Sequence, residues 1–331
     1  MKLMWSLSAF FMLGASLALT GGCGTSTVAP SLVASAPRDR LYLSLVYTGN
    51  VDVFSLPITG KSQAVASVVG RADPWAMEFD STGRLFVANA PQTEVYAQPI
   101  IDGAQPALVV PATPPEWMTP LDVSFDKAGD LFVGGYTVTV NTCPPPVYNH
   151  DIPTVEVLST PISGSSQVDF SITEQSVCGG PSVDGLAFDP DGNLWTAIGP
   201  PYAMSPGTSR LDEFSPPFSN KSTPVASISM EVYAVRFDAE GDMYVSSGDG
   251  IDVFKPPFGP SMTKAFSIAA GAGATGMAFD NSGNLYAVVP GTDTGGDLAM
   301  FVPPFGSASL PAVTIPGRSF GLGFSGVAIG P

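Results

Sequence analysis

The sequence contains one histidine and few basic residues, and both scarcities exclude classes of function. His150 is the single imidazole among 331 residues, so every site that needs two or more histidines is excluded. Lys and Arg together number 13 and are scattered along the chain. Because binding to a phosphate backbone requires a clustered positive surface, we expect no nucleic-acid partner.

Helical patterns are also lacking. The chain has 36 Gly and 33 Pro, which disfavour helix interiors, and no window after residue 22 repeats its apolar positions every 3.6 residues. Only 13% of the residues are charged, 44% are hydrophobic, and the net charge is −16. This composition excludes a coiled coil, a disordered acidic tail and a polytopic membrane protein.

The one long apolar run lies at the start of the chain. Lys2 is the only charged residue before Cys23, and residues 3–19 are apolar or small throughout. A basic start followed by such a stretch is typical of an export signal, which predicts a signal peptide over residues 1–22. The residues after Cys23 carry no charge and are rich in Pro and small side chains, so 23–37 is predicted to be a flexible tether.

This start resembles the signal of bacterial lipoproteins, in which Cys23 would be lipidated and become the first residue of the mature chain. Gly21 and Gly22 fit that pattern, whereas Thr20 stands where the family usually has leucine. An uncleaved N-terminal membrane anchor is the alternative. Both interpretations place the body on a membrane outside the cytoplasm, and in this family Gly24 after the cysteine would indicate an outer membrane.

The body of the chain, residues 38–331, is built from a repeat. Its first pattern is apolar-x-Phe-Asp-x-x-Gly-x-apolar-aromatic, in which Asp opens a tight turn between two strands and Gly accepts a positive φ. The five complete copies are centred on Phe79-Asp80, Phe125-Asp126, Phe188-Asp189, Phe237-Asp238 and Phe279-Asp280.

A second pattern, a Pro followed by Ile or Phe after a strand, occurs six times. These prolines are Pro57, Pro99, Pro161, Pro217, Pro257 and Pro304, and the residue after each is predicted to pack between neighbouring sheets. The first pattern also has two halves: the chain begins with the second half at Arg40–Leu43 and ends with the first half at Gly326–Ile329.

Joining the two halves gives a sixth unit and leaves no unpaired strand edge. The 294 residues of the body then divide into units of 49, within the range of propeller blades. We therefore predict an all-β, six-bladed β-propeller with four-stranded antiparallel blades, whose ring is closed by the C-terminal strand pairing with the N-terminal blade.

These residues resemble the NHL-repeat and gluconolactonase (senescence-marker-protein-like) propellers over 38–331, most strongly at VDGLAFDPDGNLW, Val183–Trp195. In the gluconolactonase-like family, Glu, Asn and Asp side chains at the ends of the inner strands hold a central metal ion. The matching positions here are Trp75, Leu121, Asp184, Tyr233, Thr275 and Ser325. Asp184 alone matches that metal site, which is a poor set of ligands for a hard cation. Glu116 and Asp122 could substitute only through a shift of their loop.

The first function hypothesis is therefore binding without catalysis. Trp75, Glu116, Trp117, Asp184 and Tyr233 are predicted to surround the mouth of the central channel, where aromatic faces and a few acceptors suit a sugar, peptide or cationic ligand. The protein would be an exported, membrane-tethered monomer that acts as a binding or scaffold protein at the cell envelope. Its partner would be an envelope protein or a saccharide, and it would need no cofactor.

Two alternatives stay open. The first is a divergent metal-dependent lactonase or esterase of the gluconolactonase-like type, which would use Asp184 and a divalent cation such as Ca²⁺. The second is a purely structural module, in which Trp75 and Tyr233 only plug the channel.

The loops on the channel-mouth face vary in length, which is typical of binding surfaces. The longest are predicted at residues 136–153, 200–209 and 290–297. Cys143 lies in the first of them and Cys178 follows in the next loop on the same face. If Cys23 carries lipid, these two cysteines remain as a pair and are predicted to form a disulfide outside the reducing cytosol. Two free thiols or a metal pair are the alternatives.

Overall fold

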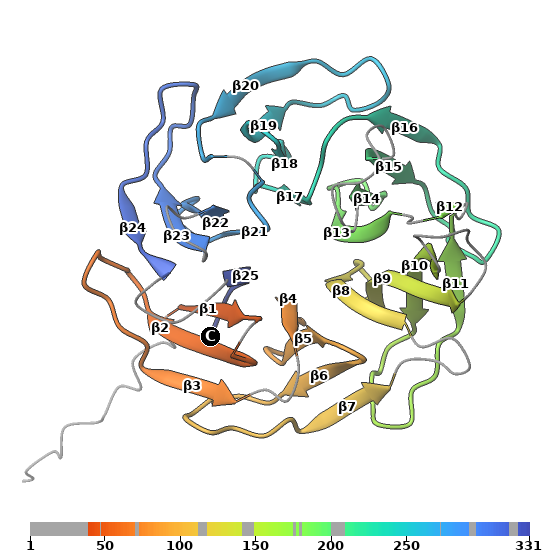
Figure 1. Cartoon of the computed structure of the whole chain (residues 1–331), viewed down its shortest axis with the longest axis horizontal. Coiled ribbons are helices and arrows are strands. Elements are labelled where there is room, and N and C mark those ends of the chain that lie inside the picture. Colours follow the sequence, from red (N-terminus) through yellow and green to blue (C-terminus); the bar gives the residue numbers. More distant parts are fainter. Residues whose placement is uncertain are drawn as a thin grey trace, which may run out of the picture. The chain divides into compact units, whose positions relative to one another are not determined.

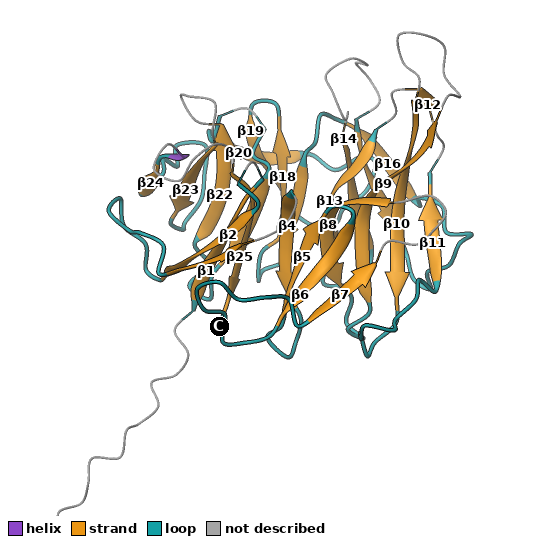
Figure 2. Ribbon diagram, turned by 60° about the horizontal axis from the view of Figure 1, so that its bottom comes forward, coloured by secondary structure: helices purple, strands orange, loops and turns teal. Residues whose placement is uncertain are grey.

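A computed structural model describes residues 39–46, 48–69, 73–111, 118–140, 149–174, 177–178, 181–199, 209–271, 273–290, 296–317 and 324–331. In this part of the chain six antiparallel sheets surround a central axis, with β25, β4, β8, β13, β17 and β21 innermost (Figure 1). Within each sheet the strands lie side by side from the axis outward, and each strand runs roughly along the axis (Figures 1 and 2). The predicted six-bladed β-propeller is confirmed.

The strands group into blades as follows. Blade 1 contains β25 (Phe324–Gly330), β1 (Arg40–Leu45), β2 (Asn50–Ser55) and β3 (Ala66–Val69). Blade 2 contains β4 (Pro74–Phe79), β5 (Leu85–Asn89), β6 (Gln92–Tyr96) and β7 (Leu108–Pro111). Blade 3 contains β8 (Met118–Phe125), β9 (Leu131–Val140), β10 (Asn149–Leu158), β11 (Phe170–Thr173) and the short β12 (Val177–Cys178).

Blade 4 contains β13 (Ser182–Phe188), β14 (Leu194–Gly199), β15 (Arg210–Phe214) and β16 (Ala226–Ser229). Blade 5 contains β17 (Ala234–Phe237), β18 (Met243–Ser247), β19 (Gly250–Phe254) and β20 (Lys264–Ile268). Blade 6 contains β21 (Gly276–Phe279), β22 (Leu285–Pro290), β23 (Gly296–Phe301) and β24 (Val313–Ile315). Among these described residues no helix is long and apolar enough to cross a membrane.

The ring closes as the two half-repeats predict. Strand β25 pairs antiparallel with β1, and Leu41 lies opposite Ile329 in the register. Side chains also pack between blades all the way around the ring. Each of six hydrophobic clusters contains residues from two adjacent blades. One of these clusters holds Leu41 and Leu43 from blade 1 against Tyr286 and Leu298 from blade 6.

The Phe-Asp-x-x-Gly segments form the predicted turns. In every copy the Asp Oδ1 accepts backbone N–H groups from the residues two and four positions later; for Asp80 these distances are 3.0 Å and 2.9 Å. The glycine of each turn has a φ between +77° and +90°, which residues with a Cβ rarely adopt. The carboxylate thus supplies an acceptor for two backbone N–H groups of each turn.

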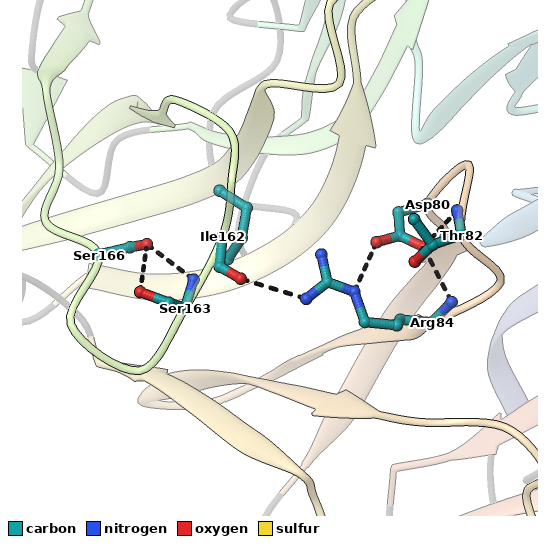
Figure 3. A network of polar contacts seen from close by, with 6 residues as sticks. All are labelled: Asp80, Thr82, Arg84, Ile162, Ser163 and Ser166. Atoms are coloured by element: carbon teal, nitrogen blue, oxygen red, sulfur yellow. Dashed lines mark hydrogen bonds and ion pairs between the residues drawn. The ribbon is translucent and has the colours of Figure 1, made fainter. Parts of the chain in front are cut away.

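The Pro-[Ile/Phe] segments pack between blades, as predicted. Phe258 of blade 5 lies edge-on to Trp195 of blade 4, with ring centroids 5.8 Å apart, and Ile58 packs on blade 6. Figure 3 shows a polar contact between a Phe-Asp-x-x-Gly turn of one blade and the Pro-Ile segment of the next blade. Arg84, held by Asp80 at the blade 2 turn, donates to the carbonyl of Ile162 in blade 3 at 3.1 Å.

One predicted loop is wrong. Residues 136–153 were expected to be irregular, but β9 continues to Val140 and β10 begins at Asn149. The reason is local, since Tyr-Thr-Val-Thr-Val is rich in aromatic and β-branched residues, which favour a strand. The strands therefore extend this hairpin, and β12 pairs with its end, with Cys178 opposite His150.

Candidate functional site

Each of the six inner strands contains, or is immediately preceded by, an irregularity at the same position, and these irregularities build the site. Strands β4, β8, β13 and β25 each contain one residue more than the partner strand opposite. The extra residue falls within 75–76 in β4, at Leu121 in β8, at Asp184 in β13 and within 325–326 in β25. In the other two blades Tyr233 and Thr275 immediately precede the strand, and their N–H groups donate to Ser246 and Val288, which pair with the next residue. These are β-bulges, which redirect a side chain.

Small residues follow most of the bulges because neighbouring inner strands approach closely there. A Cβ on Gly276 would lie 2.7 Å from the carbonyl oxygen of Ser325, and one on Gly185 would lie 3.0 Å from the Cα of Ala234. Blades 1 and 2 have Gly326 and Ala76 at this position. The narrow spacing holds the six bulge residues around one axis.

All six bulge residues line one cavity of about 240 Å³ at the centre of the ring. Among the described residues, the lining consists of Trp75, Ala76, Thr119, Leu121, Tyr136, Ser182, Asp184, Tyr233, Thr275 and Ser325. These residues include one carboxyl, three aromatic rings and several hydroxyls. The lining contains no Lys, Arg or His among the described residues.

Asp184 is the only carboxyl that lines this cavity in the described part of the chain. Desolvation raises its pKa to about 7, opposed by the hydrogen bond from Ser182 and assisted by the negative charge of Asp122. The Ser182 hydroxyl donates to Asp184 Oδ1 at 2.5 Å. The other oxygen, Oδ2, lies where a Cβ on Gly199 would clash with it. Asp184 can therefore exchange a proton near neutral pH.

The same lining includes the aromatic residues Trp75, from blade 2, and Tyr233, from the segment before β17 of blade 5. Trp75 is 37% exposed, so its ring is accessible. Tyr233 donates its hydroxyl to Glu231 Oε1 at 2.6 Å. That hydrogen bond, with desolvation and the charges of Glu231 and Asp184, raises the pKa of Tyr233 to about 12, so its phenol stays protonated at neutral pH.

A buried ion pair lies next to the cavity and ties three blades together. Arg236 donates to both carboxylate oxygens of Asp122, at 3.1 Å and 3.2 Å, and to the carbonyl of Leu186 at 2.7 Å. Asp122 Oδ2 also accepts the Leu186 N–H at 2.7 Å. Nearby Glu78 has a pKa raised to about 7 by desolvation, with Arg236 opposing the shift. Both oxygens of Asp122 are thus engaged away from the cavity.

The donor set does not fit the metal ion that the gluconolactonase resemblance implies. At the six inner positions Asp184 is joined by Trp, Leu, Tyr, Thr and Ser side chains, whereas a hard cation takes six or more oxygens with several carboxylates. No group of three His, Cys, Asp or Glu side chains in the described residues is placed to hold a metal ion. Asp122 cannot complete the set, because Arg236 and backbone amides occupy it.

The structure places Trp75, Asp184 and Tyr233 in the lining of one cavity, and their role in binding a ligand stays a prediction. Glu116, Trp117, Cys23 and Cys143 lie outside the described residues, and of Cys178 only the backbone is described. Their roles at the channel mouth, in lipidation and in a disulfide stay predictions. The predicted loops at 200–209 and 290–297 also fall mainly outside the described residues.

Sequence reasoning missed several lining residues. Ser182 and Thr119 stand two positions before Asp184 and Leu121, and the two-residue period of a strand would have placed them on the same side. Tyr136 was missed because it was assigned to a loop. The Asp122–Arg236 pair spans 114 residues and carries no local signal.

The sequence matches no protein-family model and is not significantly similar to any curated protein. Solved structures share its fold. A protein of unknown function from Bacteroides caccae aligns with a TM-score of 0.59 at 11% identity, covering 88% of this chain and 99% of the other. A periplasmic gluconolactonase from Pseudomonas aeruginosa gives 0.57 at 15% identity, with the same coverage. A gluconolactonase from Xanthomonas campestris gives 0.53 at 16%, covering 76% and 79%. These likenesses establish the fold.

Proposed function

We propose that this protein is an exported propeller that binds a small organic ligand in its central cavity, through Asp184, Trp75 and Tyr233. The observation that carries the proposal is the convergence of six bulges, one from each blade, on one cavity with a single carboxyl. A largely apolar lining with a few placed polar groups is typical of small-molecule sites. The ligand classes that suit it are saccharides, peptide side chains and organic cations.

The cellular setting is part of the same proposal. The N-terminal pattern supports export and attachment through lipid on Cys23, to an outer membrane or the cell surface, with Cys143 and Cys178 oxidised to a disulfide. A periplasmic gluconolactonase among the similar structures fits an exported protein. The bound partner could then be an envelope saccharide or a side chain of an envelope protein.

A second candidate function is the hydrolysis of a lactone or ester. It is favoured by the pKa of Asp184, about 7, which suits a general base. In that scheme Asp184 takes a proton from water as the water oxygen attacks the carbonyl carbon. It then returns the proton to the leaving alkoxide as the ring C–O bond breaks.

One experiment separates these candidates. The melting temperature and tryptophan fluorescence of the full chain are measured against a library of small neutral, anionic and cationic compounds, with a pH-stat assay on an aldonic δ-lactone alongside. Binding predicts that some compounds raise the melting temperature and that Trp75→Ala and Asp184→Asn abolish the effect. Lactone turnover that is lost in Asp184→Asn and kept in Glu240→Gln would instead establish the hydrolase. An absence of any ligand response would contradict the binding function.

A further inference from the structure

The charge around the central cavity is one-sided. The described lining holds the carboxyl of Asp184 and no basic side chain. A second carboxyl, that of Glu231, lies outside this lining and accepts the hydroxyl of Tyr233. Arg236, on the inner strand β17, donates to Asp122 and to the carbonyls of Leu186 and Val235. Its positive charge is therefore already compensated by Asp122.

Three of the six hydroxyl-bearing side chains in the described lining are committed to protein acceptors. Ser182 donates to Asp184, Tyr233 donates to Glu231, and Ser325 lies 3.0 Å from the carbonyl oxygens of Pro74 and Trp75. A polyol or saccharide depends on many directional hydrogen bonds with its site. The described lining instead offers aromatic faces and a negative charge.

Aromatic faces next to a carboxylate are the combination that binds organic ammonium ions, because the ring quadrupole and the anion both attract a cation. We propose, resting on the proposed binding function, that the ligand is a small organic ammonium compound held between Trp75 and Tyr233 with Asp184 as its counter-ion. A volume of about 240 Å³ accommodates a compound of this size.

The glycines beside the carboxylates support this assignment. A side chain at Gly199 would clash with Asp184 Oδ2, and one at Gly248 would clash with Glu231 Oε2. Gly199 is the last residue of β14, and Gly248 directly follows the last residue of β18. These are the second strands, counted from the axis, of blades 4 and 5. The backbone therefore leaves room for two carboxylates on adjacent blades.

Binding should be coupled to the proton on Asp184. The groups that face it are Ser182 on its own strand, Asp122 on β8, and Tyr233 with Glu231 on the segment before β17. Asp122 is in turn balanced by Arg236. Since these neighbours supply no free positive charge, the ligand would provide it, and a cation binds best when Asp184 is ionised. Its pKa of about 7 then places the change in affinity within the neutral range.

The test compares choline with its neutral carbon isostere, 3,3-dimethylbutan-1-ol, by isothermal titration calorimetry on the full chain. Choline is expected to bind at least tenfold more tightly than the isostere at pH 8. Its affinity should fall about tenfold between pH 8 and pH 6, as a group with a pKa near 7 becomes protonated. Titrations in buffers of different ionisation enthalpy should show proton release at pH 7.

Matched variants complete the experiment. Asp184→Asn should lower choline affinity at least tenfold at pH 8 and leave the isostere unaffected. Glu240→Gln, which removes one exposed carboxylate from the β17–β18 turn at the other end of the strand, should bind choline like the native protein. Native-like melting of Asp184→Asn at pH 6 will show that the variant is folded.

The assignment of an ammonium ligand is overturned if choline does not bind, or if the neutral isostere binds as tightly as choline. It is also overturned if the affinity for choline does not change with pH, or if Asp184→Asn binds choline as tightly as the native protein. The proposed function fails separately. The proposed binding function fails only when no compound of any charge class binds in the cavity. If a neutral compound binds and Trp75→Ala abolishes its binding, the binding function stands and only the assignment of a cationic ligand is wrong.

Discussion

At the scale of single residues, Asp184 is distinguished as the one carboxyl in the described lining of the cavity. It stands at a bulge, and its carboxyl is partly buried near Asp122, with the Ser182 hydroxyl as its hydrogen-bond donor among the described residues. Desolvation and a like charge both disfavour its ionised form. The residue thus combines a raised pKa with access to the cavity, which is the usual condition of a functional carboxyl.

The first prediction concerns the stability of the protein against pH. The native state keeps the Asp184 proton up to a pKa of about 7, whereas the unfolded chain releases it near pH 4, so native stability falls as the pH rises between these values. Asp184→Asn should therefore match the native protein at pH 4 and exceed its unfolding free energy by about 1–3 kcal/mol at pH 8. Urea denaturation at both pH values measures the difference.

Glu240→Gln serves as the charge-matched control, because Glu240 is exposed in a turn. A destabilised Asp184→Asn at pH 8 would show that the ionised carboxylate is satisfied in the native state. The pKa shift argued here would then be wrong.

The second prediction concerns Gly199. A methyl group there would clash with Asp184 Oδ2 and lie 3.2 Å from the carbonyl oxygen of Val232. Gly199→Ala should displace the carboxyl, lower the melting temperature and abolish ligand responses that depend on Asp184. Gly164→Ala is the control, since a Cβ at Gly164 meets no atom within 4 Å. Equal behaviour of the two variants in thermal melting and ligand binding would show that Asp184 does not occupy this position.

At the scale of elements, the turns and strands follow from local sequence and the bulges do not. An Asp that accepts two backbone N–H groups and a Gly with positive φ appear in every Phe-Asp-x-x-Gly copy, so their positions could be read from the chain. The position of each bulge, by contrast, is related to the distance between its inner strand and the inner strand of the next blade. That distance is a property of the closed ring, and only the resemblance to known propellers pointed to these positions.

The third prediction compares two turns with the same backbone pattern. Asp126 and Asp189 each accept two backbone N–H groups, but Asp189 also accepts Asn193 Nδ2 at 2.9 Å and Trp195 Nε1 at 3.2 Å. Trp195 is fully buried, so removing its acceptor leaves an indole N–H without a partner. Asp189→Ala should cost about 2–4 kcal/mol of unfolding free energy and Asp126→Ala about 1–2 kcal/mol.

Chemical denaturation of the two variants measures this difference. The Asn variants at both positions are the matched controls, because an amide oxygen can still accept the backbone N–H groups. Equal costs for the two alanine variants would mean that the Trp195 hydrogen bond contributes nothing.

At the scale of the whole molecule, ring closure is the feature that positions the site. Half-repeats at the two ends predicted the pairing of β25 with β1, because each end carries the pattern that the other lacks. The long contacts inside the ring were beyond sequence reasoning. Ser44, for example, accepts the Gly326 N–H at 2.7 Å and lies 2.9 Å from the Trp75 carbonyl oxygen, linking the closing strand to blade 2.

The fourth prediction follows from this closure. Deletion of residues 326–331 removes most of β25, exposes the edges of β1 and the neighbouring β4, and leaves the cavity without its blade 1 wall. The truncated chain should lose its single cooperative thermal transition. Moving residues 324–331 to precede Asp39 through a two-residue turn restores the β25–β1 pairing as a hairpin, and should recover the transition. A truncated chain that melts like the intact protein would contradict closure by β25.

The central claim is that Asp184 is the proton-exchanging carboxyl of a cavity proposed to bind an organic ligand, and that the described lining does not supply the ligands for a metal ion. The most direct test is a ¹³C NMR titration of the Asp184 carboxyl, assigned through Asp184→Asn, with and without millimolar Ca²⁺. The account predicts titration near pH 7 in both samples, since one carboxylate with hydroxyls does not form a calcium site. Titration near pH 4, or a large fall in the pKa on addition of Ca²⁺, would contradict it.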